Sequence, residues 1–177
     1  FCESNSAIYS HYVPHDMAGL IELYGGADQY VKRLNANFEK SESYGFFRSN
    51  KTKEGNWTDY GNQPWTGMAH LFSYAGAPWL TQKWVRKVKA AYCDVTPYGG
   101  YRDDEDQGQM GALGVLMAIG LFEVDGGCAE KPFYEITSPL FDKVTIHLDN
   151  RYYSGKTFQI ITKGNSTDNM YIQNASL

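Results

Sequence analysis

The chain has 177 residues, enough for one domain with a substantial hydrophobic core or for part of a larger one. Hydrophobic residues make up 42% and charged residues 20% of the sequence, as is typical of a globular protein. The net charge of −4 and the lack of a dense basic stretch argue against nucleic acid as a partner. No apolar run reaches the ~20 residues needed to cross a bilayer, so we expect no membrane partner either.

The first third of the chain is predicted to be helical, because apolar residues recur with helical spacing. They form two stripes, one of Met17, Leu20, Ile21 and Tyr24 and one of Tyr30, Val31, Leu34 and Phe38. Gly25 and Gly26 separate the two helices, as glycines that follow a helix C-terminus commonly do. The polar residues 40–64 are predicted to form a long loop, and loops of this length are often functional.

Three further helices are predicted before residue 121. A short one covers 67–76, and a longer one covers 80–93, where Thr81 has the residue type of an N-cap. The third covers 106–120 and carries no charge after Gln109, so it is predicted to be buried on most sides. The apolar positions that define the faces of the last two helices are Trp84, Val88 and Ala91, and Met110, Leu113 and Met117.

The C-terminal part is predicted to contain antiparallel strands, because β-branched residues alternate there with polar ones. The predicted strands cover 143–148, 156–162 and 169–175. Helices followed by strands indicate a mixed α and β class, with a helical part over 1–131 and a β-strand part over 132–177, arranged as a sandwich or sheet. Because sequence patterns break off at both ends, we expect the chain to be a fragment of a larger protein.

Cysteines and glycosylation acceptors favour a secreted or extracellular location. The three cysteines are Cys2, Cys93 and Cys128, so at most one internal disulfide can form. Four N-x-[ST] triplets begin at Asn50, Asn56, Asn165 and Asn174. That number is a moderate excess over chance, and N-glycosylation is therefore predicted at these asparagines.

The stretch YRDDEDQGQM, residues 101–110, places four acids side by side and leaves two interpretations open. Asp106 followed by Gln109 resembles a capping box before an apolar helix, where Asp104 and Glu105 would be stabilised by the helix dipole. Alternatively, Asp104 and Asp106 are catalytic carboxylates, and Glu3 is the acid that such a site needs as a partner. A calcium-binding EF-hand is excluded, because neither possible register has both the required glycine and the required glutamate.

Two other kinds of site are not supported by the sequence. His11 and His15 have the spacing of a zinc pair, but Pro14 pushes Val13 out of the helical region. The two imidazole rings are therefore not expected on one helix face. The chain also lacks the G-x-S-x-G pattern of a serine nucleophile.

Four segments of the chain resemble glycoside hydrolase family 92, in the same order as in that family. They are ESNSAIYSHYVPHDMAGLIELYGGADQYVKRLN at 3–35, YGNQPWTGMAHLFSYAGAPWLTQKWVR at 60–86, DEDQGQMGALGVLMAIGLFEV at 104–124 and ITSPLFDKVTIHL at 136–148. The resemblance implies an exo-acting, calcium-dependent α-mannosidase that inverts the anomeric configuration. It also implies that the helices form part of an (α/α)6 barrel, followed by C-terminal antiparallel strands.

The same resemblance implies roles for individual residues. Glu3 corresponds to the general acid, and Asp104 and Asp106 correspond to the water-activating position, with Asp106 as the first choice for the base. Calcium would hold two mannose hydroxyls, with oxygen donors from Asn62 and Gln63. Within the matched segments, the substrate-binding residues implied are Asn5, His15, Asp16 and Trp65. Departures from the family pattern occur at Ser4, Ala7, His11 and Trp65–Gly67, and they concern the linkage that is cleaved.

Two functions follow from these observations. The first is hydrolysis of terminal α-mannosides in mannose-containing glycans by the whole parent enzyme, including a missing N-terminal part. The second is binding of mannose or glycan by a non-catalytic or structural fragment, because 177 residues cover too little for a closed helical barrel.

Overall fold

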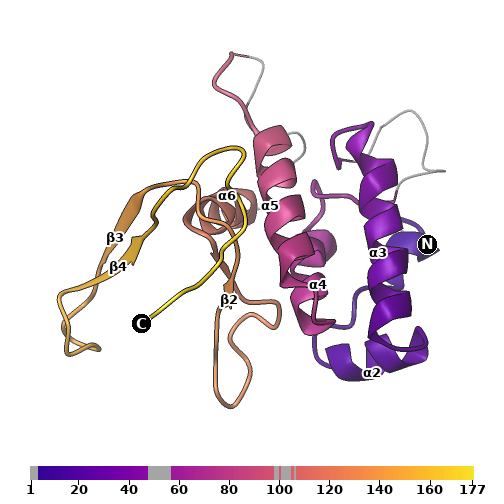
Figure 1. The fold of residues 1–177 in the computed structure, drawn as a ribbon, viewed down its shortest axis with the longest axis horizontal. Coiled ribbons are helices and arrows are strands. Elements are labelled where there is room, and N and C mark those ends of the chain that lie inside the picture. The colour runs from indigo at the N-terminus through magenta and orange to yellow at the C-terminus, as the bar shows by residue number, and fades with distance from the viewer. Residues whose placement is uncertain (1–3, 48–56, 98–99, 101–104, 106) are drawn as a thin grey trace.

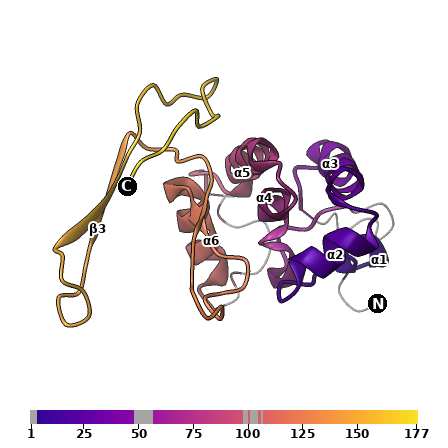
Figure 2. The same cartoon turned by 60° about the horizontal axis from the view of Figure 1, so that its bottom comes forward.

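The computed structural model describes residues 4–47, 57–97, 100, 105 and 107–177. The chain forms a helical body followed by two small pairs of strands, so the fold is of mixed α and β class. The N-terminal helices lie at one side, α5 and α6 lie in the middle, and the β3–β4 hairpin extends away from the helices (Figures 1 and 2). A closed (α/α)6 barrel is not formed by these elements, and no described helix has the length and apolar character of a membrane span.

Helices fill most of the chain up to residue 119. Their bounds are α1 Ser6–Tyr9, α2 Met17–Leu23, α3 Ala27–Glu42, η1 Gln63–Trp65, η2 Met68–His70, α4 Leu71–Tyr74, α5 Pro78–Tyr92 and α6 Gln109–Ile119, where η marks a 3₁₀ turn. The predicted helices over the first third are confirmed as α2 and α3. Met17 and Leu20 of α2 and Tyr30, Leu34 and Phe38 of α3 are buried in one core. Two glycines with positive φ, Gly25 and Gly26, make the sharp turn between them.

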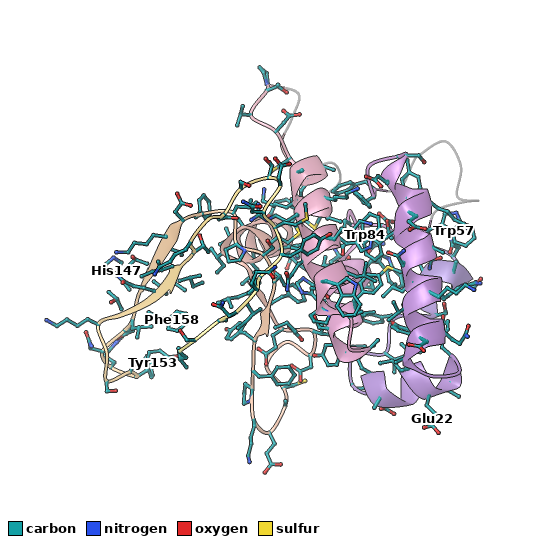
Figure 3. The ribbon with its side chains drawn as sticks, in the orientation of Figure 1. Glu22, Trp57, Trp84, His147, Tyr153 and Phe158 are labelled. Carbon is teal, nitrogen blue, oxygen red and sulfur yellow. The ribbon has the colours of Figure 1, made fainter. Side chains whose placement is uncertain are left out.

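The centre of the core lies between α3 and α5. Trp84 points from α5 toward α3 (Figure 3), where its ring stacks on Phe38 at 5.2 Å and its Nε1 donates to Asn35 Oδ1 at 2.8 Å. The prediction that Thr81 caps this helix is wrong. The helix begins at Pro78, because proline is favoured in the first turn, where no backbone donor is needed. Thr81 lies inside the helix, fully buried, with its hydroxyl 2.9 Å from Ser73 Oγ.

Helix α6 is buried on one face only, which corrects the prediction that it is buried on most sides. Met110, Leu113 and Met117 are buried as predicted. Val115, however, is 59% exposed, and Ala112 is also exposed. An apolar composition predicts that a helix will be covered, but no described element packs over this second face.

The strands form two separate antiparallel pairs. Their bounds are β1 Leu121–Phe122, β2 Glu135–Ile136, β3 Lys143–His147 and β4 Thr157–Ile161. The predictions for 143–148 and 156–162 are confirmed as β3 and β4, which pair from Lys143 opposite Ile161 to His147 opposite Thr157. The β1–β2 pair was not predicted, and two two-stranded sheets take the place of a sandwich.

The predicted strand at 169–175 is wrong, because this segment runs beside the helices without pairing to another strand. The backbone N–H of Ile172 donates to Gln82 Oε1 of α5 at 2.8 Å, and Met170 O accepts from Ser138 Oγ at 2.6 Å. Arg86 of α5 also donates to Ser138 O at 3.0 Å. The boundary between 131 and 132 stays a prediction, and these contacts link its two sides.

Cys93 and Cys128 are free thiols, so they do not form a disulfide with each other, and Cys2 lies outside the described residues. Among the glycosylation acceptors, Asn174 is exposed, while the Asn165 side chain accepts from Arg86 Nη2. Asn50 and Asn56 lie outside the described residues.

Candidate active-site pocket

Four segments that are far apart in the sequence meet around one pocket with a volume of about 260 Å³. They are the connection between α1 and α2, the η1–η2 turns, the first residue of α6, and the residues around β1. The lining residues are His11, Tyr12, Pro14, Gln63, Pro64, Trp65, Thr66, Gly67, Met68, Leu71, Gln109, Phe122, Glu123, Val124 and Gly126. A concave site where several elements meet is the usual form of a small-molecule binding site.

One wall of the pocket is aromatic. Trp65 is held at the end of the η1 turn, where its backbone N–H donates to Asn62 O at 3.2 Å. The edges of Tyr9 and Tyr12 meet the Trp65 ring at centroid distances of 4.6 and 5.8 Å. Trp65 is buried, and its Nε1 has no hydrogen-bond partner in the described part of the chain. Tyr12 is half-exposed, so its ring is accessible from solvent.

His11 lies behind this wall as a buried, neutral histidine. Its Nε2 lies 3.1 Å from Asn37 Nδ2, which can only donate, so the ring proton belongs on Nδ1, 3.3 Å from the Tyr30 hydroxyl. Burial, together with the positive charge of Arg33, lowers the pKa of His11 from 6.5 to about 4. His15 is exposed and does not share a site with His11.

The opposite wall comes from β1 and the residues after it. Phe122 stacks on His70 at 4.0 Å and lies so close to Gly67 that a Cβ there would be 3.4 Å from the Phe122 ring. Burial lowers the pKa of His70 to about 3. Glu123 follows Phe122 in this wall, and its Oε1 is buried without a hydrogen-bond partner among the described residues.

A second carboxyl group lies close to this wall. Glu135 of β2 is buried, and its Oε1 accepts from the Tyr74 hydroxyl at 2.5 Å. Burial raises the pKa of Glu135, and the negative charge of Glu123 adds to that effect. The same buried pair raises the pKa of Tyr74 well above its usual value. The region is therefore rich in acidic groups.

The acidic stretch leads into the pocket at the N-terminus of α6. The N-cap of this helix is Gly108, with φ +95°, and not Asp106, so the predicted capping box does not start the helix. Glu105 supplies the cap instead: its Oε2 accepts from the Gly108 N–H at 2.5 Å and its Oε1 from the Gly111 N–H at 3.2 Å. Gln109, the first helical residue, lines the pocket.

The predicted site residues fall into three groups. Glu3, Asp104 and Asp106 lie outside the described residues. Gln63 and Trp65 line the pocket, and Asn62 is the buried N-cap of η1. The remaining three do not line this pocket: Asn5 caps α1 by accepting from Ile8 N, Asp16 caps α2 by accepting from Gly19 N, and His15 and Asp16 line a separate depression.

The residues present fit calcium in the chemistry of their donors. Calcium takes roughly six to eight oxygen ligands from carboxylates, amides and carbonyls. Asn62 and Gln63 offer amide oxygens at one wall, and Glu123 offers a carboxylate at the other. Among the described residues, no three acidic, histidine or cysteine side chains gather as metal ligands. A complete ligand set therefore needs further donors.

Sequence reasoning missed Glu123, Tyr12 and Gln109 as pocket residues. For Glu123 a signal exists in the sequence, because a single carboxylate follows the uncharged run 109–122. For Tyr12 and Gln109 no composition or spacing distinguishes them from surface residues. The pocket brings together positions more than a hundred residues apart, and only the fold reveals that.

Comparisons with known proteins agree with this geometry. Residues 1–177 match the glycosyl hydrolase family 92 catalytic domain. An "Uncharacterized secreted glycosidase" of Arthroderma benhamiae is 30% identical over 169 residues, which cover 94% of this chain and 19% of that protein. The family GH92 alpha-mannosidase BT3965 from Bacteroides thetaiotaomicron is similar in structure, with a TM-score of 0.75, 27% identity, and coverage of 96% of this chain and 21% of that one.

A second structure of BT3965, in complex with mannoimidazole, gives a TM-score of 0.78 at 26% identity, with the same coverage. The chain thus spans about a fifth of the length of the relatives that it matches. The match to the family runs along the whole chain, and the chain belongs to glycosyl hydrolase family 92.

Proposed function

We propose that the enzyme containing this chain removes terminal α-linked mannose from glycans by a single inverting displacement, assisted by calcium. The observation that carries the proposal is the pocket in which Gln63 and Trp65 of one family segment meet Gln109 of another. Similarity to an alpha-mannosidase, including its complex with mannoimidazole, supports mannose as the sugar. The aromatic wall of Trp65 and Tyr12 suits the C–H face of a sugar ring.

In this proposal Glu3 is the general acid, which protonates the leaving oxygen of the glycosidic bond. Asp106, with Asp104, is the base that takes a proton from the attacking water. Glu105, which lies between these two aspartates in sequence, binds backbone N–H groups at the start of α6. Negative charge is favoured at a helix N-terminus, and this supports the ionised form that a base requires.

Calcium would be held by Asn62 and Gln63 together with other oxygen donors. When bound, it supplies a positive charge that orients the mannose hydroxyls. The described residues have their own functions in the proposal. The Trp65 ring positions the sugar, and the buried Phe122 at the base of the opposite wall excludes water from that side of the pocket.

Partner and location are proposed on weaker similarities. The exposed apolar face of α6 with Val115 supports contact with the N-terminal part of the same enzyme, which this chain does not contain. Secretion is supported by the name of the Arthroderma benhamiae relative and by the four glycosylation acceptors.

A second candidate function is the binding of mannose or glycan without turnover. It is favoured by the length of the chain, which spans about a fifth of its relatives. A binding fragment would bind mannose in the presence of calcium, as measured by titration calorimetry, but release no mannose from any α-mannoside.

The test uses the whole enzyme that carries this chain and an aryl α-mannoside. We expect release of mannose as the β-anomer, detected by proton NMR before mutarotation. Asp106→Ala and Glu3→Gln should each lower kcat by at least a hundredfold, as expected when a group that transfers a proton is removed. Asp103→Asn, at a neighbouring acid without an assigned role, is the matched control and should retain activity.

Chelation of calcium should abolish turnover, and added calcium should restore it. A wild-type rate in Asp106→Ala contradicts the assignment of the base. An unchanged rate after chelation removes calcium from the proposal.

A further inference from the structure

Glu123 is the one acidic residue among those that line the pocket, and its carboxylate lacks a partner. It follows β1 directly, in the wall that packs against Gly67. Its Oε1 is buried and accepts no hydrogen bond from any described residue. The two salt bridges within the described part of the chain are Lys87–Glu42 and Arg151–Asp149, so neither involves Glu123.

The groups that face Glu123 from neighbouring elements do not compensate its charge. Glu135 on β2 is itself a buried carboxyl, and Tyr74 of α4 donates its hydroxyl to Glu135. The negative charges of Glu123 and Asp125 both act on Tyr74, which sets all four groups in one acidic region. A partly buried carboxylate without a donor is costly in free energy. Its persistence at a pocket wall indicates that a ligand supplies the donor.

The rest of the pocket indicates what kind of ligand this is. Trp65 and Tyr12 offer flat apolar surfaces, and Gln63 and Gln109 offer amide groups that can both donate and accept. Trp65 Nε1, a buried donor without a described partner, complements the unpaired acceptor of Glu123. Aromatic surface combined with separated donors and acceptors suits a sugar, whose ring has apolar C–H faces and hydroxyls around its edge.

We propose that Glu123 is a substrate-binding residue that accepts hydrogen bonds from sugar hydroxyls in the pocket. The inference rests on the proposed glycosidase function and adds a residue to it. A divalent cation is the competing ligand for this carboxylate. It is disfavoured because the described residues contain no group of three acidic, histidine or cysteine side chains placed to hold one.

The test compares Glu123→Ala and Glu123→Gln in the whole enzyme, with an aryl α-mannoside and an α-linked mannose disaccharide as substrates. Loss of a hydrogen bond to a charged group should raise KM about ten- to a hundredfold in Glu123→Ala, with a smaller change in kcat. Glu123→Gln keeps an oxygen acceptor and nearly the same shape, so its KM should be intermediate. Glu130→Ala is the matched control: an exposed glutamate between β1 and β2 that does not line the pocket.

A loss with both substrates assigns Glu123 to the terminal mannose, and a loss limited to the disaccharide assigns it to the leaving sugar. Either result supports the proposal. Wild-type kinetics in Glu123→Ala overturn it. So does a loss that excess calcium restores, because Glu123 would then be a metal ligand. Thermal unfolding of Glu123→Gln serves as the check on folding.

The two levels of inference fail separately. If the wild-type enzyme hydrolyses neither substrate, the proposed function fails, and calorimetric titration with mannose still tests Glu123. Weaker binding by Glu123→Ala than by Glu130→Ala then supports its role as a sugar ligand, and equal binding overturns it.

Discussion

Acidification should loosen the packing of α3, because His11 is buried in a neutral form. Its pKa falls from 6.5 in the unfolded chain to about 4 in the fold. Between these values the unfolded state binds a proton that the folded state does not. Stability therefore rises with pH across this window and is lost as pH falls from about 6.5 toward about 4.

The magnitude follows from the size of that window. Going from about pH 7 to about pH 5 lies almost entirely below the unfolded pKa, by roughly 1.5 units, and each unit corresponds to about 1.4 kcal/mol. His11 alone should thus cost about 2 kcal/mol. His70, with a pKa of about 3, should add a loss of similar size. Glu135 acts in the opposite direction, because its raised pKa makes stability fall as pH rises through the folded value.

Hydrogen exchange of the α3 amides isolates the contribution of His11, because both of its ring nitrogens face residues of that helix, Tyr30 and Asn37. After correction for intrinsic exchange, wild-type protection should drop about 30-fold more than that of His11→Gln between these pH values. His147→Gln, at an exposed position of β3, is the control and should behave as the wild type. Equal pH dependence in wild type and His11→Gln would refute the argument.

Two further substitutions test the turns and caps that hold the pocket. Gly120→Ala, at φ +81°, would set a Cβ 2.6 Å from Pro139 Cγ and should lower the free energy of unfolding by about 2–4 kcal/mol, measured by urea denaturation. Gly76→Ala, at φ +76° with no atom within 4 Å, lacks the clash and should cost only about 1–2 kcal/mol; equal costs would contradict the role of the contact. Asp16→Ala should lose the N-cap of α2 and about 1 kcal/mol, whereas Asp16→Asn should keep it, because asparagine caps equally well; equal melting temperatures in the two variants would contradict the cap.

Helical periodicity predicted the core better than any other sequence feature. The stripes of α2 and α3 are buried as expected, because residues three and four apart share one face of a helix. Residue type alone was a weaker guide to helix ends. Thr81 is a good N-cap by type, but Pro78 fixes the start of α5, and Thr81 bonds to Ser73 from inside the helix. Local preference was overridden by tertiary contacts.

Alternation in the C-terminal segment predicted strands only where a neighbour exists. β3 and β4 pair through their whole length. The third segment has a similar pattern, but its Ile172 N–H is taken by the Gln82 side chain. A strand needs a partner strand to satisfy its backbone, and sequence pattern does not reveal whether one is present.

The carboxylates and amides of the family segments have two kinds of use in this fold, and the pocket explains why sequence patterns conflate them. Asn5 and Asp16 each satisfy backbone N–H groups at the start of a helix, as does Glu105 at α6. Side chains of this type are favoured at helix N-termini and equally in sites that bind sugars or metals. A matched motif therefore does not distinguish a cap from a ligand. Glu123 differs from these three in having a buried oxygen that no described backbone or side-chain group satisfies. An unsatisfied polar atom in a pocket wall, more than a position in a motif, is the physical mark of a group reserved for a ligand.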